Sequence, residues 1–301
     1  MDRKIYTNLE QYGDMVYGGS FGDLTTFRVG GTYDALIYPK NQLALEELLH
    51  QIRKHSIPYK LIGKGSNLLC SDRHYEGLVI RLDKYFHSVF FDEESVTAQA
   101  GASIIALSYE AAGRGLSGLE FASGIPGTVG GAVFMNAGAY KSCVKDILQE
   151  VLVYHDGFCD WMAAEELQLD YRTSIFSLKP DWLILAARFV LKTNDPETIN
   201  ALMQHRRMAR IANQPLEYPS AGSVFRNFPD QPAWQLLEGV GLRSYTIGGA
   251  RFSEKHCNFI INGGKAKASD IERLMQEAKR RVREAYGIEL IAEIERFNWD
   301  E

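Results

Sequence analysis

The sequence predicts an α+β protein in which a β-α-β unit and a run of antiparallel strands precede a smaller α/β segment. Residues 35–38 form a short apolar strand, apolar residues recur at helical spacing over 43–52, and residues 59–62 return to an apolar run. This alternation predicts the β-α-β unit. The strands expected after it are short and separated by turn residues, and they cover 78–82, 89–91, 96–100, 151–154, 158–161 and 183–191. One helix, over residues 104–112, interrupts this run.

The last third of the chain follows a polar break at residues 192–196. A helix is expected over 199–212, and a second one begins with Ser269 as its N-cap and ends at Gly287. A final strand is expected over 288–297.

A chain of 301 residues is long enough for about two domains. We expect residues 1–22 to be a loose lead-in, followed by a first domain over 23–195 and a second domain over 196–301. The first domain divides into subdomains of about 23–80 and 81–195.

The composition argues against several classes of protein. The formal net charge of −5 argues against nucleic acid as the main partner, and the basic clusters lie on helical patterns without interleaved aromatic residues. The four cysteines form no CxxC pair, which favours reduced thiols. No window approaches the length of a membrane span, and the residues after Met1 are polar rather than signal-like. We therefore expect a cytoplasmic protein without membrane association.

Two glycine-rich segments are the strongest candidates for ligand binding. Residues 124–138 contain five glycines, which let the backbone approach a flat ring or a diphosphate closely, although a tightly packed corner would need them equally. Residues 63–69 follow a predicted strand, but they match neither the Rossmann fingerprint nor a Walker A loop. Two such loops together favour a dinucleotide cofactor, because such a ligand needs two points of attachment.

Short motifs follow one another along nearly the whole chain, from about residue 23 to 296. They are TFRVGG at 26–31, GKGSNLL at 63–69, GLEFASGIPGTVGG at 118–131, YRTS at 171–174, PSAGSVFRN at 219–227, GGA at 248–250 and SEKH at 253–256. In this order they resemble the UDP-N-acetylenolpyruvoylglucosamine reductase family, also called UDP-N-acetylmuramate dehydrogenase or MurB. Only about 50 residues separate Arg172 from Ser223, so the chain resembles the shorter, type II members.

The resemblance implies a two-subdomain FAD-binding domain of the vanillyl-alcohol-oxidase (PCMH) type, followed by a smaller α/β substrate-binding domain. It also implies non-covalent FAD, with NADPH as the reductant. The implied substrate is UDP-N-acetylglucosamine enolpyruvate, which is reduced to UDP-N-acetylmuramate in peptidoglycan precursor synthesis. Such a site must stabilise negative charge on a carboxylate-conjugated carbon and must supply a proton to it.

Three residues occupy the family's catalytic positions. Ser223 would donate the proton, although a Gly-Ser pair is equally typical of a turn whose hydroxyl bonds its own backbone. Arg172 would clamp the substrate carboxylate with its guanidinium fork, although it could be a surface residue before a Ser/Thr turn. Glu293 would have to be protonated, or polarise a water, to stabilise the developing charge, although strand alternation alone places it on a solvated face.

The resemblance also implies binding residues. The expected cofactor-binding residues are Gly63, Lys64, Gly65, Ser66, Asn67, Leu68, Gly124, Ile125, Pro126, Gly127, Thr128, Gly130, Gly131, Asn136, Ala137, Gly138 and Arg226. The expected substrate-binding residues are Tyr171, Asn227, Lys255 and His256. No metal, nucleic acid, membrane or obligatory protein partner is expected.

The chain departs from the family pattern at Lys141, Phe228 and Arg296, none of which is a catalytic position. The position of Arg296, three residues past Glu293, makes the assignment of that glutamate less secure than those of the other two. Two alternatives stay open: a flavin oxidase or dehydrogenase of the same fold that acts on another substrate, and a UDP-sugar-binding module without flavin. A colourless preparation would favour the second alternative.

Overall fold

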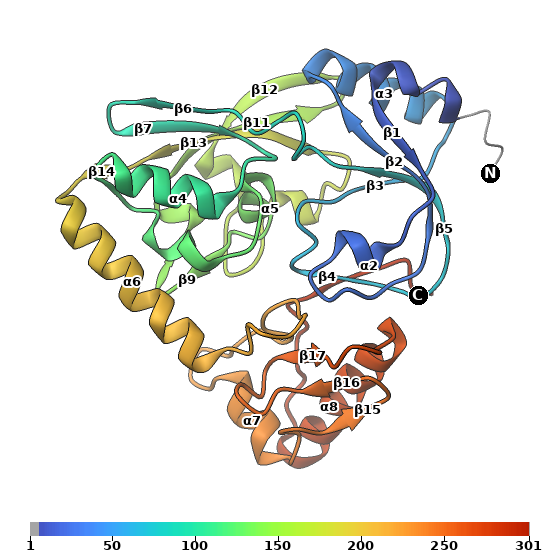
Figure 1. The fold of residues 1–301 in the computed structure, drawn as a ribbon, viewed down its shortest axis with the longest axis vertical. Coiled ribbons are helices and arrows are strands. Elements are labelled where there is room, and N and C mark those ends of the chain that lie inside the picture. Colours follow the sequence, from blue (N-terminus) through green and yellow to red (C-terminus); the bar gives the residue numbers. More distant parts are fainter. Residues whose placement is uncertain (1–5, 301) are drawn as a thin grey trace. The chain divides into compact units, whose positions relative to one another are not determined.

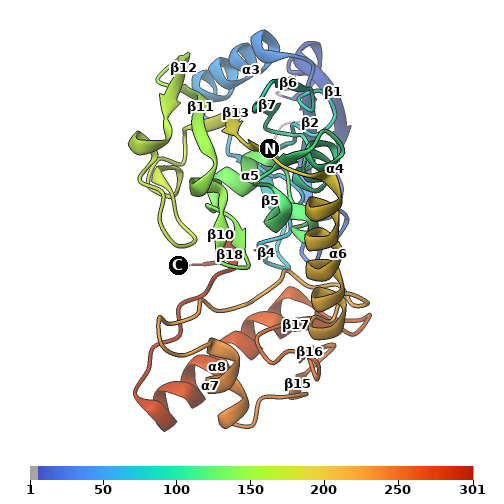
Figure 2. The ribbon, with the colours of Figure 1, turned by 90° about the vertical axis from the view of Figure 1, so that its left-hand side faces the viewer.

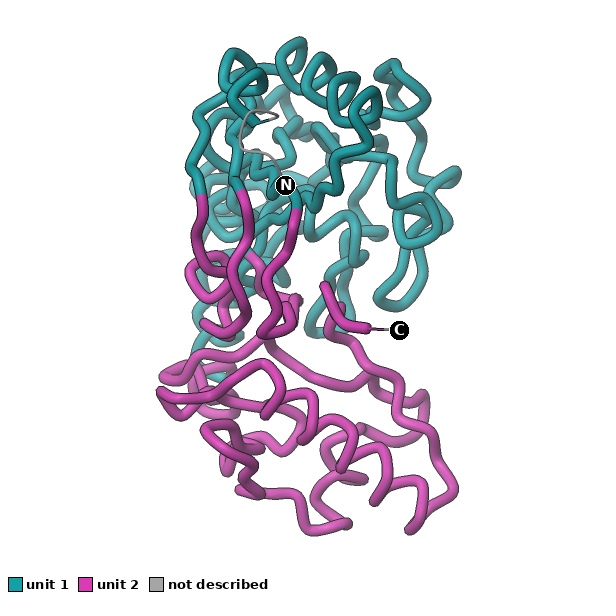
Figure 3. The backbone as a smooth tube through the Cα atoms, turned by 90° about the vertical axis from the view of Figure 1, so that its right-hand side faces the viewer, with its two compact units in different colours: residues 1–17, 35–64, 77–209 teal, residues 18–34, 65–76, 210–301 magenta. Residues whose placement is uncertain are grey.

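The computed structural model describes residues 6–300, and its internal contacts divide the chain into two compact units (Figure 3). Unit 1 contains the described residues up to Tyr17, Ala35–Lys64 and Gly77–Ala209, whereas unit 2 contains Gly18–Asp34, Gly65–Glu76 and the described residues from Arg210 onward. Both units are therefore assembled from segments that are distant in the sequence. The predicted domain boundary between residues 195 and 196 separates a cofactor-binding part from a substrate-binding part. This division of function stays a prediction.

A four-stranded sheet lies mostly in unit 1 and has the strand order β1-β2-β5-β3 (Figure 1). Its strands are β1 (Gly13–Tyr17), β2 (Tyr33–Pro39), β3 (Tyr59–Leu61) and β5 (Tyr75–Ile80). Strand β1 is antiparallel to β2, and β3 is parallel to β5. Helix α3 (Gln42–Lys54) connects β2 to β3 and buries its apolar residues in the same core as the sheet. The predicted β-α-β unit is confirmed.

The N-terminal segment is more ordered than its polar, glycine-punctuated sequence suggests. Residues 13–17 form β1 and pair with β2 from Gly13 opposite Pro39 to Tyr17 opposite Ala35. The expectation of a loose lead-in is therefore wrong for this stretch, because its pairing partner lies outside any local window. The polar residues 1–5, which argued against a signal peptide, lie outside the described residues.

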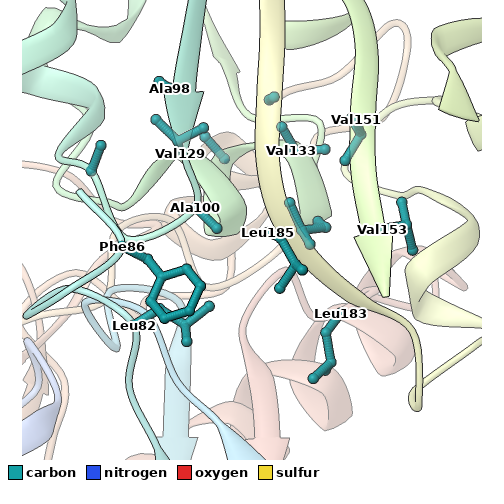
Figure 4. Packing of buried hydrophobic residues seen from close by; sticks show 14 of the residues in the cluster. Leu82, Phe86, Ala98, Ala100, Val129, Val133, Val151, Val153, Leu183 and Leu185 are labelled. Carbon is teal, nitrogen blue, oxygen red and sulfur yellow. The ribbon is translucent and has the colours of Figure 1, made fainter. Parts of the chain in front are cut away.

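A second sheet of unit 1 has five antiparallel strands in the order β12-β11-β13-β7-β6. Its strands are β6 (Val89–Asp92), β7 (Ser95–Gln99), β11 (Leu148–His155), β12 (Phe158–Ala163) and β13 (Leu183–Val190). Helix α4 (Ile104–Gly113) interrupts the run, and the short helix α5 (Val129–Phe134) contacts β13. Side chains from α5, β7, β11 and β13 form one apolar cluster (Figure 4). The antiparallel run from residue 89 onward and its interrupting helix are confirmed. The strand expected over 78–82 is instead part of β5, which belongs to the four-stranded sheet because it pairs in parallel with β3.

Unit 2 contains a small antiparallel sheet of β15 (Thr246–Ile247), β16 (Ala250–Phe252) and β17 (Ile260–Asn262). Helix α8 (Ala268–Tyr286) lies beside these strands and α7 (Ala233–Gly239) packs against α8 (Figures 1 and 2). The buried face of α8 consists of Ala268, Ile271, Leu274, Met275, Ala278 and Val282.

Two predicted boundaries in unit 2 are wrong. Helix α8 begins at Ala268 rather than after Ser269, because Asp72 accepts the N–H groups of both residues at 2.9 Å and so caps the helix from a distant loop. The predicted strand over 288–297 is shorter, since only β18 (Glu295–Phe297) pairs as a strand, parallel to β4 (Leu68–Cys70).

Helix α6 (Pro196–Asn213) confirms the helix expected over 199–212. The other short elements are η1 (Glu10–Tyr12), α2 (Phe21–Leu24), β8 (Leu116–Ser117), η2 (Glu120–Gly124), β9 (Gly138–Ala139), β10 (Ser142–Cys143), η3 (Val144–Asp146), η4 (Ala164–Leu167), η5 (Ile175–Ser177) and β14 (Lys192–Thr193). No helix within residues 6–300 combines the length and apolar character that crossing a bilayer requires.

Candidate active site

The glycines of segment 124–138 serve two different purposes. A Cβ atom on Gly130 would lie 2.9 Å from the Cβ of Ala100, so this glycine lets α5 pack closely on the end of β7. A Cβ on Gly138 would lie 2.6 Å from the carbonyl oxygen of Ser142. By contrast, Gly131 is exposed, and a Cβ on Gly127 would have its nearest neighbour at 3.9 Å. The tight-corner explanation therefore applies to part of the segment, while the rest leaves space beside the backbone.

The two glycine-rich segments meet in unit 1. A Cβ on Gly63 would lie 2.7 Å from the Oγ1 of Thr128, a residue that is 3% exposed. The same hydroxyl accepts the N–H of Gly131 at 3.2 Å and caps α5. The Gly63 backbone thus packs directly against the Thr128 side chain, which brings the two glycine-rich segments into contact.

Charged residues next to Gly63 leave a net positive charge there. The Lys64 ammonium lies 3.5 Å from the Asp83 carboxylate, and Arg81 also pairs with this carboxylate. Because two cations share one anion, this end of the loop favours an anionic ligand. Arg81 and Asp83 were not singled out from the sequence.

The other half of the 63–69 loop belongs to unit 2 and holds the segment that carries Glu293. The Asn67 side-chain amide donates to the Glu293 carbonyl at 3.0 Å, and the Glu295 N–H donates to the Asn67 carbonyl at 2.9 Å. Leu68 begins β4, which continues this pairing, and Gly65 takes a positive φ of 60° where its backbone approaches the Leu24 carbonyl.

The loop that carries Arg172 is attached to the end of the 124–138 segment. Buried Asn136 donates to the Asp170 carbonyl at 2.9 Å, and the Ser174 hydroxyl donates to the Phe134 carbonyl at 2.6 Å. The Arg172 guanidinium donates to the Gly138 carbonyl at 2.8 Å and lies 5.1 Å from the centre of the neighbouring tyrosine ring. Arg172 itself has a positive φ of 56°, which costs conformational energy in a residue other than glycine.

Ser223 and Glu293 come together within unit 2. The Glu293 N–H donates to the Val224 carbonyl at 2.8 Å, and the Arg226 N–H donates to the Ile291 carbonyl at 2.9 Å. These two hydrogen bonds lie on either side of the antiparallel bridge between Phe225 and Ala292, so Val224 lies opposite Glu293. The main chains of the two predicted catalytic residues are therefore immediate neighbours, whereas Arg172 belongs to unit 1.

The predicted substrate-binding residues have defined local partners. The Asn227 side chain accepts the Ala233 N–H at 3.0 Å at the start of α7, and the Lys255 ammonium donates to the Ile211 carbonyl at 2.6 Å. The His256 Nδ1 accepts the Asn258 N–H at 3.2 Å, and burial lowers the pKa of the His256 ring. His256 is therefore neutral at pH 7 and would act as a hydrogen-bond donor rather than as a cation.

Comparison with known proteins defines the class of the chain. The model of an FAD-binding domain matches residues 33–157, and the model of the C-terminal domain of UDP-N-acetylenolpyruvoylglucosamine reductase matches residues 214–297. The first match, together with the two sheets and the paired loops, places the chain among FAD-binding proteins of the PCMH type, which confirms the predicted fold class.

Whole-chain relatives identify the family. UDP-N-acetylenolpyruvoylglucosamine reductases from Anoxybacillus flavithermus and Bacillus anthracis (number 1) are 42% and 43% identical over 272 residues, covering 90% of each chain. The crystal structure of the same reductase (MurB) from Thermus caldophilus has a TM-score of 0.81 at 37% identity, covering 94% of this chain and 99% of that one. The chain belongs to the UDP-N-acetylenolpyruvoylglucosamine reductase family, as the motifs predicted.

Proposed function

We propose that Arg172, Ser223 and Glu293 perform the reduction of UDP-N-acetylglucosamine enolpyruvate to UDP-N-acetylmuramate in this chain. The chain is a flavoprotein oxidoreductase of peptidoglycan precursor synthesis, with FAD as its cofactor and NADPH as its reductant. The observation that carries the assignment of residues is the pairing of the Ser223 segment with the Glu293 segment inside one compact unit.

The residues of the two glycine-rich segments fit the cofactor. Gly127 and Gly131 leave open backbone, Gly63 allows the first loop to approach Thr128, and a net positive charge lies beside Lys64. Bound FAD supplies the transfer of two electrons from NADPH to the carbon–carbon double bond of the substrate. The protein supplies the binding, the orientation and the proton.

Ser223 donates the proton to the carbon beside the substrate carboxylate. An aliphatic hydroxyl is a weak acid, but the carbon that receives the proton is strongly basic while it carries the negative charge that precedes protonation. What the protein must provide is position, and the hydrogen bonds on both sides of Val224 hold the chain next to Ser223 in place.

Arg172 and Glu293 stabilise the charge that spreads into the substrate carboxylate. The bond from Arg172 to the Gly138 carbonyl orients the guanidinium, whose planar fork matches a carboxylate and stays charged throughout. Glu293 acts in its protonated form or through a polarised water, because a carboxylate would repel the developing charge.

Lys255 and His256 contact the UDP diphosphate in different ways. Lys255 carries the positive charge, while neutral His256 contributes a ring N–H because its Nδ1 is occupied by a main-chain donor. Tyr171 and Asn227 complete the expected contacts to the substrate. We also propose that the protein works in the cytoplasm, where NADPH and UDP-sugars are made.

The test separates the two half-reactions of the purified protein. A yellow preparation whose flavin absorbance is bleached by NADPH and restored by UDP-N-acetylglucosamine enolpyruvate supports the activity. Bleaching by an alcohol or hydroxy acid followed by restoration with O₂, without restoration by UDP-N-acetylglucosamine enolpyruvate, would instead support an oxidase. In the Ser223→Ala variant we expect bleaching by NADPH at a near-normal rate and slow restoration by the substrate. An equal loss in both half-reactions would contradict the role of Ser223.

A further inference from the structure

Asn258 is a fully buried polar residue whose hydrogen bonds converge on the segment that carries Ser223. It is 1% exposed and interrupts the apolar stretch that leads into β17. Its side-chain Oδ1 accepts the Phe225 N–H at 3.0 Å, and its Nδ2 donates to the Phe225 carbonyl at 2.8 Å. One carboxamide thus pairs with both polar groups of one residue, as a neighbouring strand would.

The main chain of Asn258 adds a third bond to the same segment. Its carbonyl accepts the Val224 N–H at 2.8 Å, and Ser223 forms an antiparallel bridge with Phe259. On its other side the segment pairs with the Glu293 chain, through the bonds of Val224 and Arg226 already described. The Ser223 segment therefore lies between Asn258 and the Glu293 chain, and its register against both is determined by hydrogen bonds.

We propose that Asn258 is a positioning residue for proton donation, because its side-chain amide holds Phe225 and through it the placement of Ser223 against Glu293. This inference rests on the proposed function. Asn258 acts through the main chain of the segment and not by contact with the reacting atoms. A displacement of about 1 Å at such a position is enough to slow a reaction by on the order of 100-fold.

Two substitutions test the amide itself. Asn258→Leu has a similar size but offers neither hydrogen bond, whereas Asn258→Asp is nearly isosteric and titratable. A protonated aspartic acid has one O–H donor and one carbonyl acceptor, which can satisfy the Phe225 carbonyl and N–H; the ionised form has only acceptors. Asn262→Leu is the matched control, since Asn262 is also buried and hydrogen-bonded but holds Phe27, Gly264 and Ala266 instead.

The rates are measured on the FAD-loaded full chain, with bleaching by NADPH and restoration by substrate followed separately. For Asn258→Leu we expect restoration to be roughly 10- to 100-fold slower, with bleaching and the substrate KM near normal. For Asn258→Asp we expect restoration to slow, relative to wild type, as pH rises between roughly 5 and 9 and the buried carboxyl ionises. His256 and Cys257 are titratable neighbours of Asn258 in the sequence. The wild-type profile in the same buffers corrects for the ionisation of His256, and burial raises the pKa of Cys257 to about 11, above this range.

Amide hydrogen exchange on the same proteins separates this inference from the proposed function. We expect faster exchange over residues 223–226 and 291–294 in Asn258→Leu, and no such change in Asn262→Leu. Unchanged exchange, or equal losses in both half-reactions, would overturn the positioning role. Faster exchange with an unchanged restoration rate would overturn the positioning role as well, whereas a normal restoration rate in Ser223→Ala would refute the role given to Ser223 itself. If Asn258→Leu does not fold, the pH profile of Asn258→Asp decides, and a profile parallel to wild type overturns the inference.

Discussion

The contact between Gly63 and Thr128 allows a quantitative test of how the two glycine-rich loops meet. In Gly63→Ala the added Cβ would lie 2.7 Å from the Thr128 Oγ1, which is too close for two unbonded atoms. Because Gly63 is outside the positive-φ region, the backbone conformation itself is open to alanine and the clash is the only obstacle. Thr128 cannot rotate away freely, since it is buried and its hydroxyl caps α5.

The expected cost of Gly63→Ala is about 1–3 kcal/mol in the free energy of unfolding, the usual range for an overpacked site. Thr128→Ala alone removes the cap and should cost about 1 kcal/mol. In the Thr128→Ala background the atom nearest the added methyl group is the Cβ of residue 128, at an ordinary 3.7 Å. The added cost of Gly63→Ala should therefore fall to nearly zero, and the double-mutant cycle should give a coupling of about 1–3 kcal/mol.

The assay is urea unfolding of the four proteins of the cycle, with FAD affinity measured in parallel by flavin fluorescence. Gly113→Ala is the matched control: a Cβ at this helix-terminal position meets nothing within 4 Å, so stability should be unchanged or slightly higher. A cost for Gly63→Ala that is equal with and without the Thr128 side chain would refute the reasoning. Full stability with undiminished FAD binding would refute it as well.

Three further predictions concern ionisable groups. Hydrogen bonds from Arg280 and Arg281 lower the pKa of Glu277 to about 2. The ionised carboxylate therefore stabilises the fold, and this stabilisation is lost as pH falls from about 4.5 to 2. Glu277→Gln should flatten the acid-unfolding curve in that window, and curves parallel to wild type would contradict this. Burial lowers the pKa of His256, so the unfolded chain takes up a proton before the folded chain does. The free energy of unfolding should therefore decline as pH falls below about 6.5. His256→Gln should reduce that decline in thermal unfolding measurements. Burial raises the pKa of Cys159 to about 12, so this thiol should resist alkylation by iodoacetamide at pH 8 in the native protein. Mass spectrometry that finds it alkylated as fast as in an unfolded control would disprove the shift.

Local patterns predicted the parts of the fold that depend on local physics. The apolar positions of α3 and α8 recur at helical spacing, and both helices bury these faces. The strands of the five-stranded sheet were found within a few residues, because turn signals separate them. The identity of the site depended on motif order rather than on periodicity, since strand alternation alone would leave Glu293 on a solvated face.

The remaining features depend on partners that are distant in the sequence. Strand β1 carries no strong pattern and exists because β2 pairs with it, and α8 begins where Asp72 reaches it from another segment. Asn258 did leave a signal, as a polar residue within the run from Cys257 to Ile261. Which chain it holds could not be deduced from that signal, because pairing across such a separation is a property of the folded molecule.

The bond between Asn67 and Glu293 joins residues that are 226 positions apart, and this has a consequence for how the protein is made. At translation rates of about 5–20 residues per second, β4 waits on the order of ten to forty seconds before its partner β18 is synthesised. During that time residues 68–70 at the end of the first glycine-rich loop lack their strand partner, so a chaperone or another nascent chain can bind them first. The pairing of β4 with β18 thus becomes possible only after residues 295–297 have been synthesised.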